Sequence, residues 1–227
     1  MLSKHHFEIS LFSNFILFDW LIFQNIIGFV AITCGVLIGC LLPDTDLPKS
    51  KIDYMEGITG FFGMISKNIL NPLVAAIFES YLKKSIDRGH RGITHTVYGI
   101  LVYCVLIEGI SLPILFFLGF RISIIMYSLF VFGLFLGGIF HLMEDSCTIT
   151  GILPFYPLNS IKKYSGKIST YDMADIRPKY FSRSLLFIAV CLLIIQVYLK
   201  SDIVVNILSS IGIFLLSWIV IILISRI

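Results

Sequence analysis

The sequence predicts an all-α fold: a polytopic membrane helical bundle with about five transmembrane helices and one interfacial or re-entrant helix. Composition is the first observation behind this prediction. Hydrophobic residues make up 57% of the 227 residues and charged residues only 14%, whereas soluble domains carry about 25% charge. The second observation is that the apolar residues occur in runs of roughly 20, the length with which an α-helix crosses the hydrocarbon core.

Five apolar runs are predicted to span the membrane: residues 21–42, 96–120, 122–142, 184–199 and 203–225. Arg121 connects the second run to the third, and Lys200-Ser201-Asp202 connects the fourth to the fifth. Such short connections predict antiparallel helical hairpins. A further stretch, residues 57–82, is apolar but is interrupted by polar residues and Pro72, so we expect an interfacial or re-entrant helix there.

We expect residues 1–227 to form a single integral membrane domain. It would comprise a motif-bearing core at about 35–158, a polar loop at 160–183 and a C-terminal helical hairpin at 184–225. The N-terminus does not resemble a signal peptide, because Asp19 and Gln24 interrupt its apolar stretch and no small-x-small cleavage site follows. We therefore expect it to be an amphipathic segment that leads into the first span.

The distribution of basic residues predicts the orientation. With five spans, fourteen of the 17 lysines and arginines fall on one side of the membrane, and only Lys4, Arg121 and Lys200 fall on the other. Cytoplasmic loops carry the excess of Lys and Arg, so we place the first side in the cytoplasm of a bacterial inner membrane. The basic residues lie in loops and form no continuous stripe, and we expect no nucleic-acid binding.

Three polar motifs interrupt the apolar sequence, and the predicted topology places all three at one depth on one side. They are Pro43-Asp44-Thr45-Asp46-Leu47-Pro48 after the first span, His90-Arg91-Gly92-Ile93-Thr94-His95 before the second, and His141-Leu142-Met143-Glu144-Asp145-Ser146 at the end of the third. Taken singly, each motif also suits an ordinary polar helix end. Ionisable residues at membrane depth are costly and commonly functional, and a divalent cation would offset the cost of their carboxylates.

The residue types in these motifs are those of a metal site. His141 and Asp145 are four residues apart and share one helix face. Thr94 is expected to cap the second span, which places His95 in the first helical turn. Mixed His and Asp ligands suit zinc in the first place and manganese in the second. The expected metal ligands are Asp44, His95, His141 and Asp145, followed by His90 and Asp46.

The motifs together resemble the YdjM-type family of bacterial inner-membrane proteins, which are described as predicted membrane-bound metal-dependent hydrolases. The resemblance covers about residues 35–158. It rests on Leu41-Leu42-Pro43-Asp44-Thr45-Asp46 with Pro48, on residues 90–95, and on Gly138-Ile139-Phe140 followed by residues 141–146, Thr148, Gly151 and Pro157. The family is grouped with zinc-dependent phospholipase C and nuclease-like helical folds, which implies phosphoester hydrolysis. Because the predicted site opens at the level of the lipid headgroups, we expect a lipid or lipid-linked phosphate as the substrate.

The chain departs from the family pattern in two places. Members open with a Thr-His pair, but this chain opens with Met1-Leu2-Ser3-Lys4-His5-His6. Five spans would put His5 and His6 across the membrane from the other motifs. Glu144 stands where the family commonly has an apolar residue.

If the chain is a hydrolase, Asp46 or Glu144 is expected to act as the general base. Arg91 is expected to bind an anionic group of the substrate.

Two other functions use the same cluster. A divalent-metal transporter would need polar residues deeper in the bilayer, and the five-span topology places only Glu108 there. A structural membrane protein, in which the metal locks helices together, would have a closed site with four protein ligands.

Overall fold

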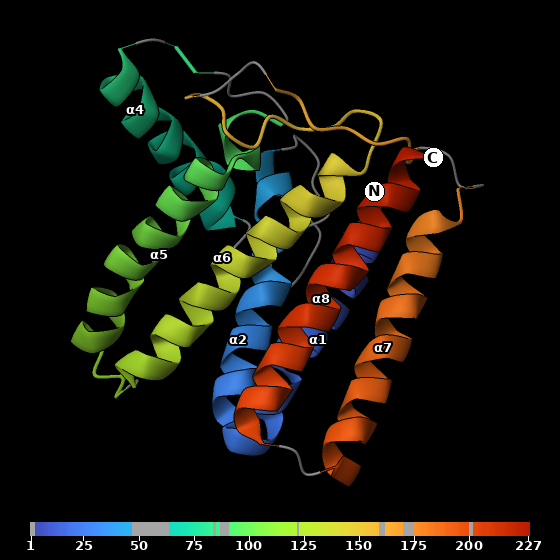
Figure 1. Cartoon of the computed structure of the whole chain (residues 1–227). Coiled ribbons are helices and arrows are strands. Elements are labelled where there is room, and N and C mark those ends of the chain that lie inside the picture. The colour runs from blue at the N-terminus through green and yellow to red at the C-terminus, as the bar shows by residue number, and fades with distance from the viewer. Residues whose placement is uncertain are drawn as a thin grey trace.

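A computed structural model describes residues 3–46, 64–83, 85–86, 91–121, 123–158, 162–169, 175–199 and 202–227. In this part of the chain the regular elements are helices (Figure 1), as predicted. Six of the helices are long and apolar enough to cross a membrane. The predicted fold class is confirmed, but the predicted number of five spans is wrong by one.

The additional span is at the N-terminus. Helix α1 (Ser3–Gln24) and helix α2 (Ile26–Gly39) meet at Asn25, whose side chain accepts a hydrogen bond from the Gly28 amide and caps α2. The predicted first span, residues 21–42, therefore straddles a turn between two helices, and the expected amphipathic segment is itself a span. The prediction failed because it took Asp19 as an interruption of the apolar stretch, whereas Asp19 is fully buried against other helices.

The remaining spans are α5 (Val97–Phe117), α6 (Ile124–Ser146), α7 (Arg177–Leu199) and α8 (Ile203–Arg226). Helix α7 begins at Arg177, so the end of the predicted polar loop at 160–183 is helical. Helix α6 continues past the predicted end of its span at residue 142 and carries all of the third motif.

Helix α4 (Asn71–Leu82) follows a π-helical turn at Ser66–Leu70 and occupies the C-terminal part of the predicted interfacial segment. Together with the turns before it, this segment is not among the six helices that are long and apolar enough to cross a membrane, in agreement with the prediction. Residues 57–63 of the same prediction lie outside the described part of the chain.

Helices α2 and α6 pack against each other through glycines. Gly35 and Gly39 of α2 face Gly133 and Gly137 of α6, and each set has the spacing G-x-x-x-G. A Cβ atom on Gly35 or Gly39 would collide with the α6 backbone, and one on Gly133 or Gly137 with the α2 backbone. Small residues at this spacing allow two membrane helices to approach closely. The glycine seam brings the end of α2 beside the last turns of α6.

Helix α1 packs against α2, α6, α7 and α8. Ile9 and Ile16 of α1 join one hydrophobic cluster with Phe140 of α6, Leu185 of α7 and Trp218 of α8. Figure 1 shows the N-terminus and the C-terminus at the same end of the bundle. This follows from an even number of spans, and it places the start of α1 at the end where α2 and α6 finish and α5 begins.

Candidate metal centre

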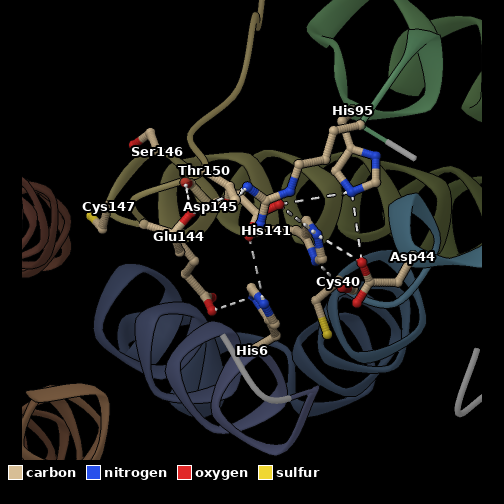
Figure 2. Close-up of polar contacts among 12 residues, drawn as sticks. His6, Cys40, Asp44, His95, His141, Glu144, Asp145, Ser146, Cys147 and Thr150 are labelled. Carbon is tan, nitrogen blue, oxygen red and sulfur yellow. Dashed lines mark hydrogen bonds and ion pairs between the residues drawn. The ribbon is translucent and has the colours of Figure 1, made fainter. Parts of the chain in front are cut away.

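The three polar motifs meet at one end of the bundle, where α1 adds a fourth contribution. Figure 2 shows the imidazole and carboxylate groups converging from the α1 helix, the Pro43–Asp46 turn, the Ile93–His95 turn and α6. Two overlapping sets of side chains place their ligand atoms within 4.8 Å of one another, and His141 belongs to both. The sets are His6, Asp44 and His141, and His95, His141 and Asp145.

The central atoms of this cluster are two imidazole nitrogens that face two carboxylate oxygens. His141 Nε2 lies 3.6 Å from both Asp44 Oδ1 and Asp145 Oδ2. His95 Nε2 lies 3.6 Å from Asp44 Oδ1 and 3.8 Å from Asp145 Oδ2. These separations are long for hydrogen bonds. They are close to the roughly 3.3 Å that separates ligand atoms around a tetrahedral ion with bonds of about 2.0–2.1 Å.

His141 makes a hydrogen bond on the side of its ring that points away from the aspartates. This bond determines which ring nitrogen carries the proton and which one turns a lone pair toward the cluster. His141 Nδ1 lies 2.7 Å from the carbonyl oxygen of Cys40. A carbonyl oxygen only accepts, so Nδ1 must carry the proton, and the neutral ring presents the lone pair of Nε2 to the two aspartates. Metal-binding histidines are oriented in this way.

His6 supplies a third imidazole. Its ring stacks on that of His141 with centroids 4.3 Å apart, and its Nε2 lies 3.9 Å from Asp145 Oδ1. The expectation that five spans place His6 across the membrane from the motifs is wrong, because α1 is a span that starts at the same end. The same change moves Lys4 to this end as well.

Glu144 stands behind His6. Its Oε2 approaches His6 Nδ1 to 2.7 Å, and its Oε1 accepts a hydrogen bond of 3.0 Å from Ser10. A proton on His6 Nδ1 would leave Nε2 as the lone pair that faces Asp145. Glu144 is buried and belongs to neither ligand set among the described residues. This position suits a carboxylate that orients an imidazole ligand.

Arg91 holds the second oxygen of Asp145. Its Nη2 donates to Asp145 Oδ1 over 3.0 Å, and its Nη1 donates to the Gly151 carbonyl over 3.0 Å and to the Thr150 hydroxyl. Asp145 therefore presents Oδ2 to His95 and His141 while Oδ1 is bound to the guanidinium. The side chain of Arg91 is 16% exposed, so the residue lies at the edge of the cluster.

His95 reaches the cluster from a turn that precedes α5. Thr96, and not Thr94 as predicted, caps α5 by accepting a hydrogen bond of 2.9 Å from the Gly99 amide. His95 consequently lies in the short 3-10 turn Ile93–His95, where it is fully buried. The helix cap therefore lies two residues later than predicted, but His95 still reaches the cluster as expected.

Two predicted residues are not placed at the site. The backbone of Asp46 lies in the 3-10 turn Pro43–Asp46, but its side chain is outside the described part of the structure. His90 also lies outside the described residues. Their roles as ligand or general base stay predictions.

The charges of the cluster suit a bound cation. With neutral histidines and ionised acids, Asp44, Glu144 and Asp145 carry three negative charges against the single positive charge of Arg91. Two of its buried atoms, His141 Nε2 and Asp145 Oδ2, make no hydrogen bond in the structure. Buried unpartnered polar atoms are costly. A divalent cation would balance the charge and satisfy the lone pairs, so these residues fit the expected metal.

Sequence reasoning missed the contribution of α1. His6, Ser10, Ser13 and Asn14 are all buried, and their spacing of four, seven and eight residues places them on one helix face. Ser10 bonds Glu144, and Asn14 donates to Thr33 over 2.9 Å. The prediction that Glu108 is the only polar residue deep in the bilayer is therefore wrong. This polar stripe inside an apolar segment was the signal that could have revealed the sixth span.

Comparison with known protein families matches residues 1–226 to the family described as "YdjM inner membrane protein". No curated protein and no solved structure matches the chain. The six apolar helices agree with the inner-membrane placement that this description states, and together they support a multi-pass inner-membrane protein. Because the match covers nearly the whole sequence, including α1 and the three motifs that meet at the end of the bundle, the chain belongs to the YdjM inner membrane protein family.

Proposed function

We propose that this protein is a membrane-bound metal-dependent hydrolase that acts on a phosphoester or lipid-type substrate at the cytoplasmic face. The observation that carries the proposal is the convergence of five buried or half-buried donor residues, His6, Asp44, His95, His141 and Asp145. A closed structural zinc site uses four. Each of the two overlapping ligand sets offers three donors, and three protein ligands leave a catalytic zinc ion with one position for water or substrate.

Each side chain has a defined role in this proposal. The three histidines and two aspartates would hold the metal, zinc or manganese. When bound, such an ion lowers the pKa of a coordinated water, to about 7 in favourable zinc sites. Glu144 holds the His6 ring, and Arg91 holds Asp145 while keeping a partly exposed guanidinium for an anionic group. Asp44 is the most exposed carboxylate of the cluster, with 20% of its side chain accessible, so a substrate would approach beside it.

The orientation of the six spans supports a cytoplasmic site. With Lys4 on the motif side, only Arg121 and Lys200 of the 17 basic residues fall in sequence at the opposite ends of the spans. The excess of basic residues on one side is larger than for five spans. By the positive-inside rule, the end of the bundle with the cluster faces the cytoplasm. A site at that depth meets the headgroups of the inner leaflet, which favours a lipid or lipid-linked phosphate as the substrate.

A structural role for the metal is the second candidate. It is favoured by the origin of the ligands, which come from four separate elements and would be tied together by one ion. The two functions differ in whether the bound metal keeps a position open to solvent or substrate.

Metal analysis of the detergent-purified full chain tests both functions, with His141→Ala and Asp44→Ala as disrupted variants and His5→Ala as a matched control. We expect about one or two zinc or manganese ions per chain, lost in the two disrupted variants and kept in the control. A hydrolase would then cleave bis(p-nitrophenyl) phosphate, and its cobalt-substituted form would change its absorption spectrum when phosphate is added. Metal retention with no cleavage and an unchanged spectrum would favour the structural role. A metal-free wild type would rule out both the hydrolase and the structural role of a metal.

A further inference from the structure

A second buried polar cluster lies near the opposite end of the bundle. Asp19 of α1 is fully buried, and it accepts hydrogen bonds of 2.8 Å from Gln196 Nε2 of α7 and 2.5 Å from Ser210 Oγ of α8. Asp19 is five residues from the end of α1, about 7.5 Å along the helix, and thirteen residues, about 20 Å, beyond His6. The cluster is therefore separate from the metal centre.

The groups around Asp19 are neutral. Gln196 and Ser210 face it from α7 and α8, and the amide of Trp20 faces it from its own helix. No ion pair to Asp19 occurs among the described residues. An unpaired carboxylate inside a membrane is costly, and the usual response of a buried acid without a cation is to take up a proton.

Ser210 can satisfy Asp19 in either protonation state. Its Oγ lies 2.5 Å from Asp19 Oδ1 and 2.8 Å from the carbonyl oxygen of Asn206, but a hydroxyl has only one proton to donate. When Asp19 is ionised, Ser210 donates to it. When Asp19 is protonated, Asp19 donates to Ser210, and Ser210 donates to the Asn206 carbonyl. Rotation of one hydroxyl accommodates the proton with no change in the heavy-atom positions.

Gln196 adds a second adjustable partner. Its Nε2 donates to Asp19 Oδ2, while its Oε1 is buried and makes no hydrogen bond in the structure. A flip of the amide would place Oε1 opposite Asp19 Oδ2 as an acceptor for a proton on that oxygen. Both carboxylate oxygens thus face a side chain that donates in one arrangement and accepts in the other.

The carboxylate is also part of a helix kink. Phe18, immediately before Asp19, has non-helical backbone angles (φ −124°, ψ 17°), and Asp19 Oδ1 accepts a hydrogen bond of 2.8 Å from the Trp20 amide. The side chain therefore bonds the backbone directly beside the kink. Because an ionised carboxylate is the stronger acceptor, the charge on Asp19 changes the strength of this hydrogen bond.

We propose that Asp19, Gln196 and Ser210 form an intramembrane proton-binding site. The site is independent of the proposed hydrolase activity and holds a proton on Asp19 through the switchable partners in α7 and α8. Proton uptake and release at this site involve one carboxyl group and reorientation of the Ser210 hydroxyl and the Gln196 amide.

Infrared difference spectroscopy of the full chain in nanodiscs, recorded between two pH values, tests the site directly. We expect a protonated-carboxyl C=O band in the wild type that disappears in Asp19→Asn. The band should remain in Glu108→Gln, the matched control that removes another carboxyl from a membrane helix. Identical wild-type and Asp19→Asn difference spectra in the carboxyl region would mean that Asp19 does not change its protonation state between the two pH values and would overturn the proposal.

Ser210→Ala keeps the proposal testable if Asp19→Asn does not fold. This variant preserves the carboxyl but removes its hydroxyl partner, so the C=O band should shift in frequency and its pH midpoint should move. A band with unchanged frequency and midpoint would show that Ser210 takes no part in proton binding and would contradict the assignment. Metal content serves as the independent readout, because loss of the metal centre would leave the Asp19 band in place.

Discussion

At the scale of single residues, the proposed metal centre is defined by the group that holds each imidazole ring from behind. The Cys40 carbonyl holds the proton of His141 on Nδ1, and Glu144 occupies the corresponding position behind His6. Each partner directs Nε2 toward an aspartate. His5, the neighbour of His6 in sequence, is half-buried and belongs to neither ligand set. Adjacent histidines thus have different roles because α1 turns only one of them into the bundle.

The first prediction concerns His6. We expect His6→Ala to lower the affinity for zinc at least 10-fold, because the ring supplies one of three imidazoles in the cluster. His5→Ala should bind zinc like the wild type, since His5 lies outside the cluster. Competition with a chromophoric chelator measures both affinities. Equal affinity in His6→Ala and His5→Ala would show that α1 contributes no ligand.

Glu144 gives the second prediction. We expect Glu144→Gln to weaken zinc binding about 10- to 100-fold, the usual effect of losing a group that orients a ligand. If Glu144 were instead the general base proposed from sequence, the variant would bind zinc normally and lose only turnover. Zinc affinity and turnover of bis(p-nitrophenyl) phosphate, measured on the same preparation, separate the two roles.

At the scale of helices, the glycine seam between α2 and α6 sets the position of the cluster. The seam runs through Gly35 and Gly39 on one helix and Gly133 and Gly137 on the other. Asp44 follows the end of α2 by a few residues, and His141 follows Gly137 by one turn of α6. The close approach of the two backbones therefore places Asp44 against His141.

The third prediction tests this seam. Gly137→Leu should separate α2 from α6, because its side chain would meet the α2 backbone at Val36 and Cys40. We expect a loss of at least about 1–3 kcal/mol of stability, the usual range for overpacking, together with weaker metal binding. Gly212→Leu is the control, since a Cβ at Gly212 meets nothing within 4 Å. Thermal unfolding in detergent compares the two, and equal stability would contradict the role of the seam.

A fourth prediction concerns the start of α7. Asp175 accepts hydrogen bonds from the Ser169 amide, the Arg177 amide and the Arg177 guanidinium, and so ties the preceding segment to the helix. The Arg177 guanidinium lowers the pKa of Asp175 to about 2, below the ordinary value of about 3.9. A lowered pKa means that the stabilisation is fully present above about pH 4 and is lost as the pH falls toward 2.

Asp175→Asn should accordingly cost up to about 1 kcal/mol of unfolding free energy at neutral pH, because it removes the ion pair with the Arg177 guanidinium. The difference from the wild type should shrink on acidification through this window. Melting temperatures measured as a function of pH provide the check, with Asp202→Asn as the control because asparagine caps a helix as well as aspartate does. If the difference in melting temperature between the wild type and Asp175→Asn did not shrink toward pH 2, the assigned ion pair would be contradicted.

At the scale of the whole molecule, six spans place both termini at the end that carries the metal centre (Figure 1). The fifth prediction follows from this arrangement. We would fuse a reporter that distinguishes the cytoplasm from the periplasm to the N-terminus, and another to the C-terminus. Both reporters should indicate the cytoplasm. A reporter inserted in the connection at Arg121 should report the opposite side. Termini on opposite sides would require an odd number of spans and would separate His6 from Asp145.

The sequence by itself determined the class of protein and most of the candidate site. Long apolar runs require lipid as the solvent, and the three motifs fall at helix ends that alternate between the two sides of the membrane. Asp44, His95, His141 and Asp145 were therefore predicted to lie together, and the structure brings them together. This part was predictable because hydrophobic length and helix periodicity act locally along the chain.

Only the tertiary structure decided the place of α1. Its segment contains His6, Ser10, Ser13, Asn14 and Asp19, which by composition suggest a surface helix. In the fold each of these side chains is buried against a neighbouring helix: α6 receives His6 and Ser10, α8 receives Ser13, α2 receives Asn14, and α7 and α8 receive Asp19. A polar residue is tolerated inside a membrane bundle when partners on other helices satisfy it, and those partners are up to 205 residues away in sequence. No local pattern contains that information.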